Sequence, residues 1–445
     1  MRKIQLATLL AAACVGGAAH GATLLQVYQE ALANDPVIAS ARANLQAGRE
    51  KEPQAFSQLL PQISASLTST RTLGDISVPI AGVSGDRNNT TNTYLVSLTQ
   101  PLFRLANWEA WQQGKLQVAA TEAVYAQAQQ DLIVRVSQAY FDVLASQDAL
   151  ATVQAQKAAI TEQLASAKRN FEVGTATITD THEAQARYDL AEAQEIAADA
   201  DLQIRRAALQ QIIGHAPAPL APFKPGLKLE LPQPSRVDDW VKSAENQNYS
   251  VVGQQLAFEI ADREIKRNRA AHAPTLDLVA SRGRNLLNGP ALTTPTATAT
   301  TATNSTQLGV QLTVPLYAGG LVNSRVREAV ALQDKARSDL ENARRTAAQG
   351  ARQAYLGVTA GLAQVRALEA AEVSSQSALD SNLLGYQVGV RINIDVLNAQ
   401  QQLYTTRRDL ARARYDTVLN AFRLKNAAGV LKEDDVVKIN TLLQP

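Results

Sequence analysis

Four short segments of the chain alternate apolar and polar residues with a period of two. The clearest runs from Leu308 to Leu316, where leucine and valine occupy every second position and Gly, Gln, Thr and Pro the positions between. Residues 63–68, 94–99 and 276–281 repeat this alternation. A period of two over about 10 residues predicts strands with one apolar and one polar face. Such strands suit either an outer-membrane barrel or a half-buried soluble hairpin, and the pattern alone favours neither.

Two much longer segments have a helical pattern instead. Residues 105–172 contain no proline, are rich in Ala, Gln, Leu and Val, and space their apolar side chains at intervals of 3, 4 and 7. This heptad-like spacing predicts a coiled-coil helix on the order of 100 Å long. Residues 319–386 repeat the pattern. Each segment is followed by a glycine, Gly174 or Gly389, after which a shorter helix returns, so we expect two long helical hairpins.

The two hairpins end in closely similar sequences. Residues 173–189 read VGTATITDTHEAQARYD, and residues 388–404 read VGVRINIDVLNAQQQLY. Matching residues are shifted by 215 positions, and each copy has an aspartate at the same place, Asp180 or Asp395. This agreement predicts an internal duplication with the same turn built twice.

The duplication extends through most of the chain and predicts its organisation. Each repeat is a helical stretch, two strands and a long helical hairpin, and the offset between matching residues varies only from 213 to 215. The helical stretches lie at about 36–58 and 250–271. We therefore predict repeat 1 at residues 23–214, a proline-rich linker at 215–248, repeat 2 at 249–429 and a C-terminal segment at 430–445.

A membrane location would constrain how such a chain assembles. No stretch after the N-terminal segment reaches the 18 or more apolar residues of a spanning helix, so a crossing must use strands. Four strands cannot close a barrel, and unpaired backbone groups at an open edge would each cost several kcal/mol in lipid. Two chains would give a barrel too narrow for a water-filled lumen, whereas three would give twelve strands. The residues thus predict an oligomeric channel with a helical extension.

The N-terminus and the charge balance indicate an exported protein. Residues 1–22 are expected to be a signal peptide, with Arg2 and Lys3 before an apolar run and small residues before the cleavage site. Its removal lowers the formal net charge from +2 to 0, which argues against nucleic-acid binding. The only cysteine, Cys14, lies in this segment, and Ala11 fits a lipidation site poorly. A large exported chain without further cysteine suits a Gram-negative periplasm or outer membrane.

Residues that could carry catalysis are not grouped in the sequence. The four histidines are scattered without metal-ligand spacing, and outside the signal peptide no nucleophile elbow or P-loop occurs. We therefore expect no enzyme activity, no cofactor and no metal. The remaining alternative to a channel is a periplasmic adaptor, in which a shorter helical hairpin is flanked by β-domains. The near-equal duplication and the two strands per repeat argue against it.

Long stretches of the chain resemble the TolC family of outer-membrane channel proteins. They include LLPQISASL, AYFDVL, FEVGTATITD, LTVPLYAGGLVNSRV and GYQVGVRINIDVLNAQQQLY. The resemblance implies an α+β membrane protein: a homotrimeric 12-stranded outer-membrane β-barrel, four strands per chain, continued by a long α-helical coiled-coil barrel across the periplasm. Residues 215–248 and 430–445 would form an equatorial band around it.

The resemblance also implies a transport function without catalysis. A channel of this family exports drugs or proteins in tripartite efflux or type I secretion systems. Its partners would be a periplasmic adaptor (membrane fusion) protein, an inner-membrane RND, ABC or MFS transporter, and the lipid of the outer membrane.

By the same resemblance, the hairpin ends form a periplasmic gate. Thr179 and Asp180 of one coil would be linked to Tyr386 and Arg391 of the other by hydrogen bonds and salt bridges, and Asp395 would face the constriction. On sequence alone, both aspartates also suit a helix cap or first turn, and capping and gating are compatible.

Asn398 departs from the family pattern, which has a second acid at this position, one helical turn after Asp395. Each chain would then contribute one carboxylate to the entrance instead of two, which predicts weaker cation binding there. We expect Asn398→Asp to strengthen the block of single-channel currents by multivalent cations. An unchanged block would contradict this assignment.

Overall fold

The computed structural model describes residues 21–78, 83–86, 88–224, 226, 229–290 and 298–444. The described part is mostly helical, with a small antiparallel sheet. The chain divides into two compact units, the first made of residues 1–40, 127–248 and 346–445 and the second of residues 41–126 and 249–345. Nearly all of the predicted signal peptide lies outside the described residues. None of the described helices is long and apolar enough to span a membrane.

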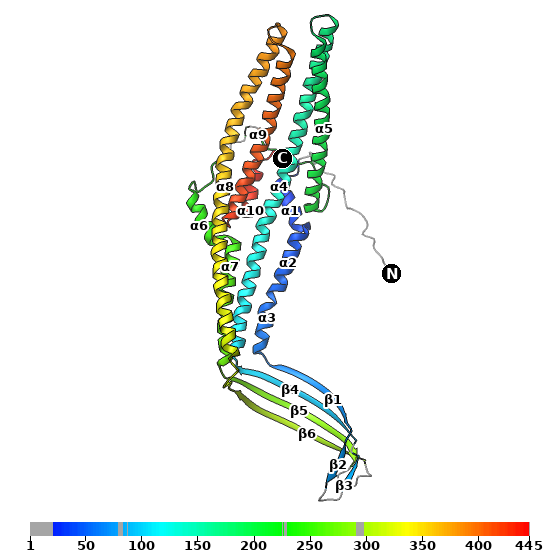
Figure 1. The fold of residues 1–445 in the computed structure, drawn as a ribbon, viewed down its shortest axis with the longest axis vertical. Coiled ribbons are helices and arrows are strands. Elements are labelled where there is room, and N and C mark those ends of the chain that lie inside the picture. Colours follow the sequence, from blue (N-terminus) through cyan, green and yellow to red (C-terminus); the bar gives the residue numbers. More distant parts are fainter. Residues whose placement is uncertain are drawn as a thin grey trace, which may run out of the picture. The chain divides into compact units, whose positions relative to one another are not determined.

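The second unit contains the four-stranded sheet. Its strands run in the order β1 (Gln62–Thr72), β4 (Asn89–Phe103), β5 (Thr275–Pro290) and β6 (Thr298–Thr313), all antiparallel (Figure 1). The strands contain the segments of period-two alternation, except that residues 314–316 follow the end of β6. Between β1 and β4, the chain also forms a short ribbon of β2 (Asp75–Val78) and β3 (Val83–Asp86), in addition to the two strands expected in this repeat.

The register of the sheet separates its two faces cleanly. Paired residues in neighbouring antiparallel strands share a face, and one such row is Ile63, Leu98, Ala280 and Leu308. The adjacent row contains Ser64 and Ser97, whose hydroxyl oxygens lie 2.8 Å apart. Leu308 is 76% exposed in the isolated chain, so the apolar face is not covered by another element of the described chain.

An ion pair ties the sheet to the long helix that follows it. The Arg104 guanidinium, just before α4 (Leu105–Glu172), donates to both oxygens of Asp277 near the start of β5, at 2.8 and 2.6 Å. The carboxylate is buried, and this bidentate geometry is the strong form of the arginine–carboxylate pair. The strand-to-helix turn is thereby held against the neighbouring strand.

The remaining helices of the second unit lie next to the sheet in sequence. Helices α2 (Pro36–Arg49) and α3 (Lys51–Phe56) precede β1, and α7 (Tyr249–Arg269) precedes β5. Short 3₁₀ turns at Ser57–Leu59 and Ala270–His272 complete these helical stretches.

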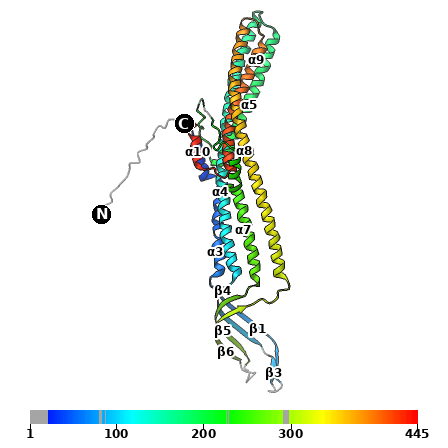
Figure 2. The same ribbon diagram turned by 90° about the vertical axis from the view of Figure 1, so that its left-hand side faces the viewer.

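The first unit contains the helical hairpins and the segments packed around their middle. One hairpin is the end of α4 with α5 (Ile178–Ile213), and the other is the end of α8 (Leu321–Gln387) with α9 (Asn393–Ala427), as Figure 2 shows from the side. Three short helices belong to the same unit: α1 (Leu24–Asn34), α6 (Val237–Gln247) and α10 (Glu433–Asn440).

Aromatic side chains form the centre of this unit. Tyr140 of α4 is fully buried, and its hydroxyl donates to the carbonyl oxygens of Ala22 at 3.1 Å and Ala221 at 2.7 Å. On the adjacent side, Phe223 of the linker stacks on Tyr415 of α9 with ring centroids 5.0 Å apart. The linker after repeat 1 is thus fixed to the hairpins by aromatic packing.

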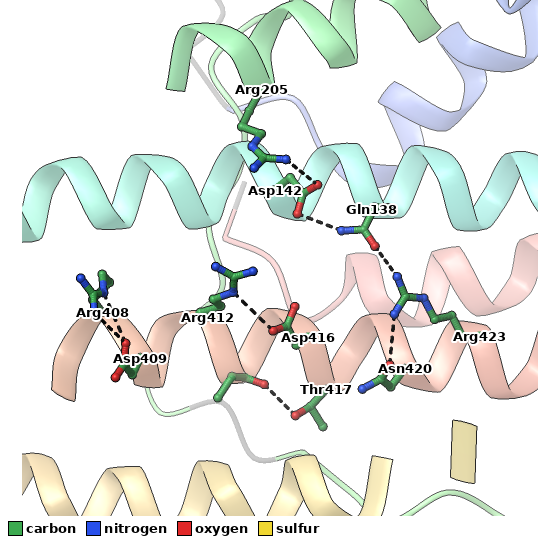
Figure 3. A network of polar contacts seen from close by, with 11 residues as sticks. Gln138, Asp142, Arg205, Arg408, Asp409, Arg412, Asp416, Thr417, Asn420 and Arg423 are labelled. Atoms are coloured by element: carbon green, nitrogen blue, oxygen red, sulfur yellow. Dashed lines mark hydrogen bonds and ion pairs between the residues drawn. The ribbon is translucent and has the colours of Figure 1, made fainter. Parts of the chain in front are cut away.

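A groove on α4 between α5 and α9 is lined by charged residues (Figure 3). A polar chain crosses it: Arg423 donates to Gln138 at 2.7 Å, Gln138 donates to Asp142 at 2.8 Å, and Arg205 lies 3.6 Å from the same carboxylate. Because Arg423 lies on α9 and Arg205 on α5, this chain of contacts fixes the spacing of three helices.

A second polar contact joins α4 to α9. The Tyr415 hydroxyl donates to an oxygen of Asp148 at 2.7 Å. Burial raises the pKa of the Asp148 carboxyl above its usual value, and the hydrogen bond from Tyr415 offsets only part of that effect. When folding raises the pKa of a carboxyl group, the protonated carboxyl favours the folded state. This contribution to stability is complete at pH values below the pKa of the unfolded state, and it is lost as the pH rises through the pKa of the folded state.

We therefore expect Tyr415→Phe to lower stability at neutral pH by about 1–3 kcal/mol, because the half-buried carboxylate loses its donor. At a lower pH, once the Asp148 carboxyl is protonated, the loss should shrink. Asp148→Asn retains an acceptor without a charge and should change stability by less than about 1 kcal/mol. Thermal unfolding followed by circular dichroism at both pH values measures this, and a pH-independent loss in Tyr415→Phe would contradict it.

Candidate functional site

The free ends of the two hairpins have the same turn. Gly174 and Gly389 both have φ of +78°, in the left-handed region that favours glycine. In each turn the glycine N–H donates to the carbonyl three residues earlier, at 3.0 and 3.1 Å. The next N–H donates to the carbonyl five residues earlier, at 2.8 and 2.9 Å. These are the bonds of the Schellman motif, which ends α4 and α8 and lets the chain reverse.

The two predicted aspartates occupy the same position in their helices but have different partners. Asp180 is the third residue of α5, where it accepts hydrogen bonds from the Thr177 N–H at 2.9 Å and hydroxyl at 2.8 Å. Thr177 accepts in return from the Asp180 N–H, which completes a capping box. Asp395 is the third residue of α9, but the residue before that helix is Ile392, which has no hydroxyl. Asp395 instead pairs with Arg391 at 3.6 Å.

Tyr386 and Arg391 make no hydrogen bond or ion pair with Asp180 among the described residues of the chain. Tyr386 accepts a hydrogen bond from the Asn170 amide at 3.2 Å and packs beside Leu379, Val396 and Leu403. Thr179 is exposed and makes no side-chain hydrogen bond with another described residue. Within the described chain, the expected links from Thr179 and Asp180 to Tyr386 and Arg391 are absent, so they stay a prediction for contacts between chains.

Amide side chains, which the sequence analysis did not single out, join the two hairpins instead. Asn393, the first residue of α9, is 1% exposed. Its carbonyl oxygen accepts from the Gln163 amide of α4, and its own amide donates to the Asp180 carbonyl of α5 at 3.3 Å. Asn393 therefore connects both helices of the first hairpin to the start of α9.

Two further contacts extend this connection along the helices. Arg187 of α5 donates to the side-chain oxygen of Asn398 at 3.0 Å, and Gln156 of α4 donates to Gln401 at 3.3 Å. Asn398, the position where the family pattern has an acid, is thus used as a neutral acceptor for an arginine. We call the contacts of Asn170, Gln156, Gln163, Arg187 and Asn393 across the hairpins the amide network.

An apolar cluster underlies the amide network. It combines residues of α4, α5 and α9, with Leu397 inserted between the two helices of the first hairpin. Its buried members are Ile160, Leu164, Ala167, Ala184, Ala191 and Leu397. Three alanines allow the helices to approach closely, and that approach brings the amides within hydrogen-bonding distance.

A charged pair within the first hairpin is less buried than the amides. Lys157 donates to Glu195 at 2.9 Å within the first hairpin. This hydrogen bond lowers the pKa of Glu195 and raises the pKa of Lys157. Because both of its residues belong to the first hairpin, this pair does not join the two hairpins, and the contact between them rests on the amides. In the described part of the chain, no cluster of acidic and histidine residues is suited to hold a metal.

Comparison with known proteins identifies the family to which the chain belongs. A family model described as outer membrane efflux protein matches residues 27–215 and 240–430, which is most of the chain. The chain belongs to the outer membrane efflux protein family. It is an outer-membrane channel of the efflux and secretion type, and this family does not consist of enzymes. The resemblance found in the sequence is confirmed.

Individual relatives support the assignment over nearly the whole chain. Outer membrane protein TolC of Escherichia coli is 34% identical, covering 94% of this chain and 85% of the relative. Alkaline protease secretion protein AprF of Pseudomonas aeruginosa is 31% identical, covering 93% and 85%. The crystal structure of VceC from Vibrio cholerae superposes with a TM-score of 0.77 at 19% identity, covering 91% of this chain and 96% of that one. The likeness in fold therefore extends over both units.

The sequence contained one signal for the amide network. Asn393 stands 215 residues after Ile178, so the duplicated turns differ by an amide where the first has an apolar side chain. A buried asparagine at a break in the duplication indicates a role that one hairpin has and the other lacks.

We expect Asn393→Ala to loosen the contact between hairpins, since it leaves the buried Gln163 amide without its acceptor and removes the donor that reaches the Asp180 carbonyl. Each such loss costs about 1–3 kcal/mol. Hydrogen–deuterium exchange of peptides covering residues 160–185 and 390–405 should accelerate in this variant. Arg391→Ala, which removes only an exposed 3.6 Å pair, is the control and should leave the exchange of residues 160–170 unchanged. Equal exchange in both variants would contradict a special role for Asn393.

Proposed function

We propose that the chain forms a homotrimer whose twelve strands close one barrel in the outer membrane. The observation that carries this proposal is the strand order, in which β1 and β6 are the two edges of the sheet and have no partner strand among the described residues. Edge N–H and C=O groups cannot remain unpaired in lipid. Pairing β1 of one chain with β6 of the next satisfies both edges, and three chains give a lumen that water can fill.

The helices would continue this barrel as a tunnel across the periplasm. Exposed apolar side chains on α5 and α8 support lateral packing between chains, because such residues are rarely left in water along two whole helices. They include Leu190, Ile196 and Ile204 of α5 and Leu356, Val373 and Leu384 of α8. The two repeats at residues 23–214 and 249–429 would place equivalent hairpins around the tunnel, and residues 215–248 with 430–445 would form the equatorial band.

The hairpin ends would be the gate. Thr179 and Asp180 of one chain would contact Tyr386 and Arg391 of a neighbour, while the amide network holds the two hairpins of each chain together. Asp395 and Asn398 would line the entrance. Opening would separate coils that have two alternative packings, and no catalytic step, cofactor or metal is needed.

The exposed apolar residues at the hairpin ends support docking of a partner protein. Val173, Val388, Val390 and Ile392 surround the two turns, and Val390 is 74% exposed. We assign this surface to a periplasmic adaptor, which would connect the channel to an inner-membrane RND, ABC or MFS transporter. Drugs or secreted proteins would then pass through the channel, as the efflux and protease-secretion names of its relatives suggest.

Planar-bilayer recording of the purified mature protein, together with its mass in detergent, tests this proposal. We expect a mass of three chains and small, steady currents. Arg391→Ala and Asn393→Ala should raise the conductance, because each removes a contact that holds the entrance closed. Arg412→Ala, which removes an exposed pair on α9 far along the chain from the turn, is a control that should conduct like the wild type. A monomer without conductance would overturn the proposal.

A further inference from the structure

The apolar face of the four-stranded sheet contains arginines. Residues with even numbers in β5 share a face with Ile63, Val96 and Leu308, and that series includes Arg282 and Arg284. The register sets Arg282 beside Val96 and Thr306, and Arg284 beside Tyr94 and Asn304. Both arginine side chains are exposed. A guanidinium on a face that otherwise suits lipid needs a physical reason.

No residue of the described chain neutralises these two charges. Arg282 and Arg284 make no hydrogen bond or ion pair with another described residue, in contrast to Arg104, which is bound by Asp277. The same face of the four-stranded sheet has no aspartate or glutamate, and Arg71 near the end of β1 adds a third positive charge. The only carboxylate in these four strands, Asp277, lies on the opposite face. The positive charge of the apolar face is therefore uncompensated within the described chain.

The position along β5 decides where the arginines lie relative to lipid. Leu276, Leu278 and Ala280 are the preceding residues on the same face. With a rise of about 3.4 Å per residue and a strand tilt of about 40°, Arg282 and Arg284 lie about 15 and 20 Å above Leu276 along the membrane normal. The apolar band of such barrels is about 25 Å tall. Both arginines therefore lie in the half of the band farther from the helices, within reach of the outer interface.

The neighbours of the arginines mark the same boundary. Toward the helices, the rows of this face are mostly apolar, as in Ile63, Leu98, Ala280 and Leu308. On the loop side, beyond Arg284, the next row is half polar, with Ser69 and Asn92, and the row after it is wholly polar, with Arg71, Thr90, Asn288 and Thr300. Tyr94, next to Arg284, is typical of an aromatic residue at a membrane interface. Long arginine side chains at such a boundary extend toward polar head groups while their methylene groups stay in lipid.

We propose that Arg282 and Arg284 bind the phosphate groups of an anionic lipid in the outer leaflet. Residues two apart on one face of a strand lie about 7 Å apart, so two guanidinium groups can contact one head group that carries more than one phosphate. Guanidinium binds phosphate through two parallel hydrogen bonds, which lysine cannot form. The bound lipid would supply the negative charge that this face lacks. This inference rests on the proposed barrel, because it requires the apolar face to contact lipid.

Native mass spectrometry of the delipidated trimer tests the inference, with diphosphorylated lipid A, its monophosphorylated form and phosphatidylethanolamine as probes. We expect the wild-type protein to retain the diphosphorylated lipid best. Arg282→Gln/Arg284→Gln should reduce that retention on the order of twenty-fold, since each arginine near an anionic lipid surface contributes roughly five-fold. Arg282→Lys/Arg284→Lys should be intermediate, because charge remains but the paired hydrogen bonds are lost.

The control variant is Arg344→Gln/Arg352→Gln, which removes two exposed arginines of α8 outside the sheet and should retain lipid like the wild type. Trimer mass and bilayer conductance are recorded for every variant. If the double glutamine variant does not assemble, the single variants Arg282→Gln and Arg284→Gln should each still lower retention. Equal retention in conducting wild-type and variant trimers would overturn this inference alone. Loss of trimer and conductance in the wild type would instead overturn the proposed function.

Discussion

The pairing of backbone groups at the edges of the sheet is the constraint on which the rest of the proposed architecture depends. A sheet in the order β1-β4-β5-β6 has two edge strands, and water can satisfy their N–H and C=O groups only outside lipid. In the proposed trimer, neighbouring copies of the chain complete the sheet. The antiparallel register then decides which side chains face lipid and which face the lumen.

The hairpin ends follow a different physical principle. Buried neutral amides, centred on Asn393, join the hairpins within a chain, whereas the charged residues nearby are exposed. Hydrogen bonds between neutral groups are little affected by salt, and amides do not titrate, so this contact should hold over a wide range of conditions. The exposed pair of Arg391 and Asp395 is screened by salt and is more easily exchanged for contacts with a partner.

Much of the fold could be predicted because its signals are local. Period-two alternation located the four strands, and Gly174 and Gly389 marked the turns where a positive φ is required. The ribbon of β2 and β3 was not predicted, because the segment carries no alternation that distinguishes it from a polar loop. In the candidate site, the partners of the two predicted aspartates were not predicted either, because the duplication places both residues in similar local sequences. Asp180 and Asp395 have equivalent positions, and only the residue before each helix, Thr177 or Ile392, decides between a capping box and an ion pair.

The contacts that sequence reasoning missed join residues far apart in the chain. Gln163 and Asn393 are 230 residues apart, and although Asn393 marks a break in the duplication, nothing in the sequence points to Gln163 as its partner. Their pairing depends on how closely α4, α5 and α9 approach, which the alanines of the apolar cluster determine through packing. The arginines on the apolar face were hidden in a similar way, because β5 read alone is ambiguous and only the register with β4 and β6 assigns their face.

Disulfide cross-linking between the sheet edges tests the central claim most directly. The sequence has one cysteine, Cys14, inside the predicted signal peptide, so introduced pairs would have no competing thiol. One cysteine would replace Ala65 of β1 and the other would be moved along β6 through Thr306, Leu308 and Val310. Within a chain these strands are separated by β4 and β5, about 14 Å, which is too far for a disulfide. The account predicts that one register gives covalent species of up to three chains and none larger. Cross-linking that stops at two chains, or continues beyond three, would contradict it.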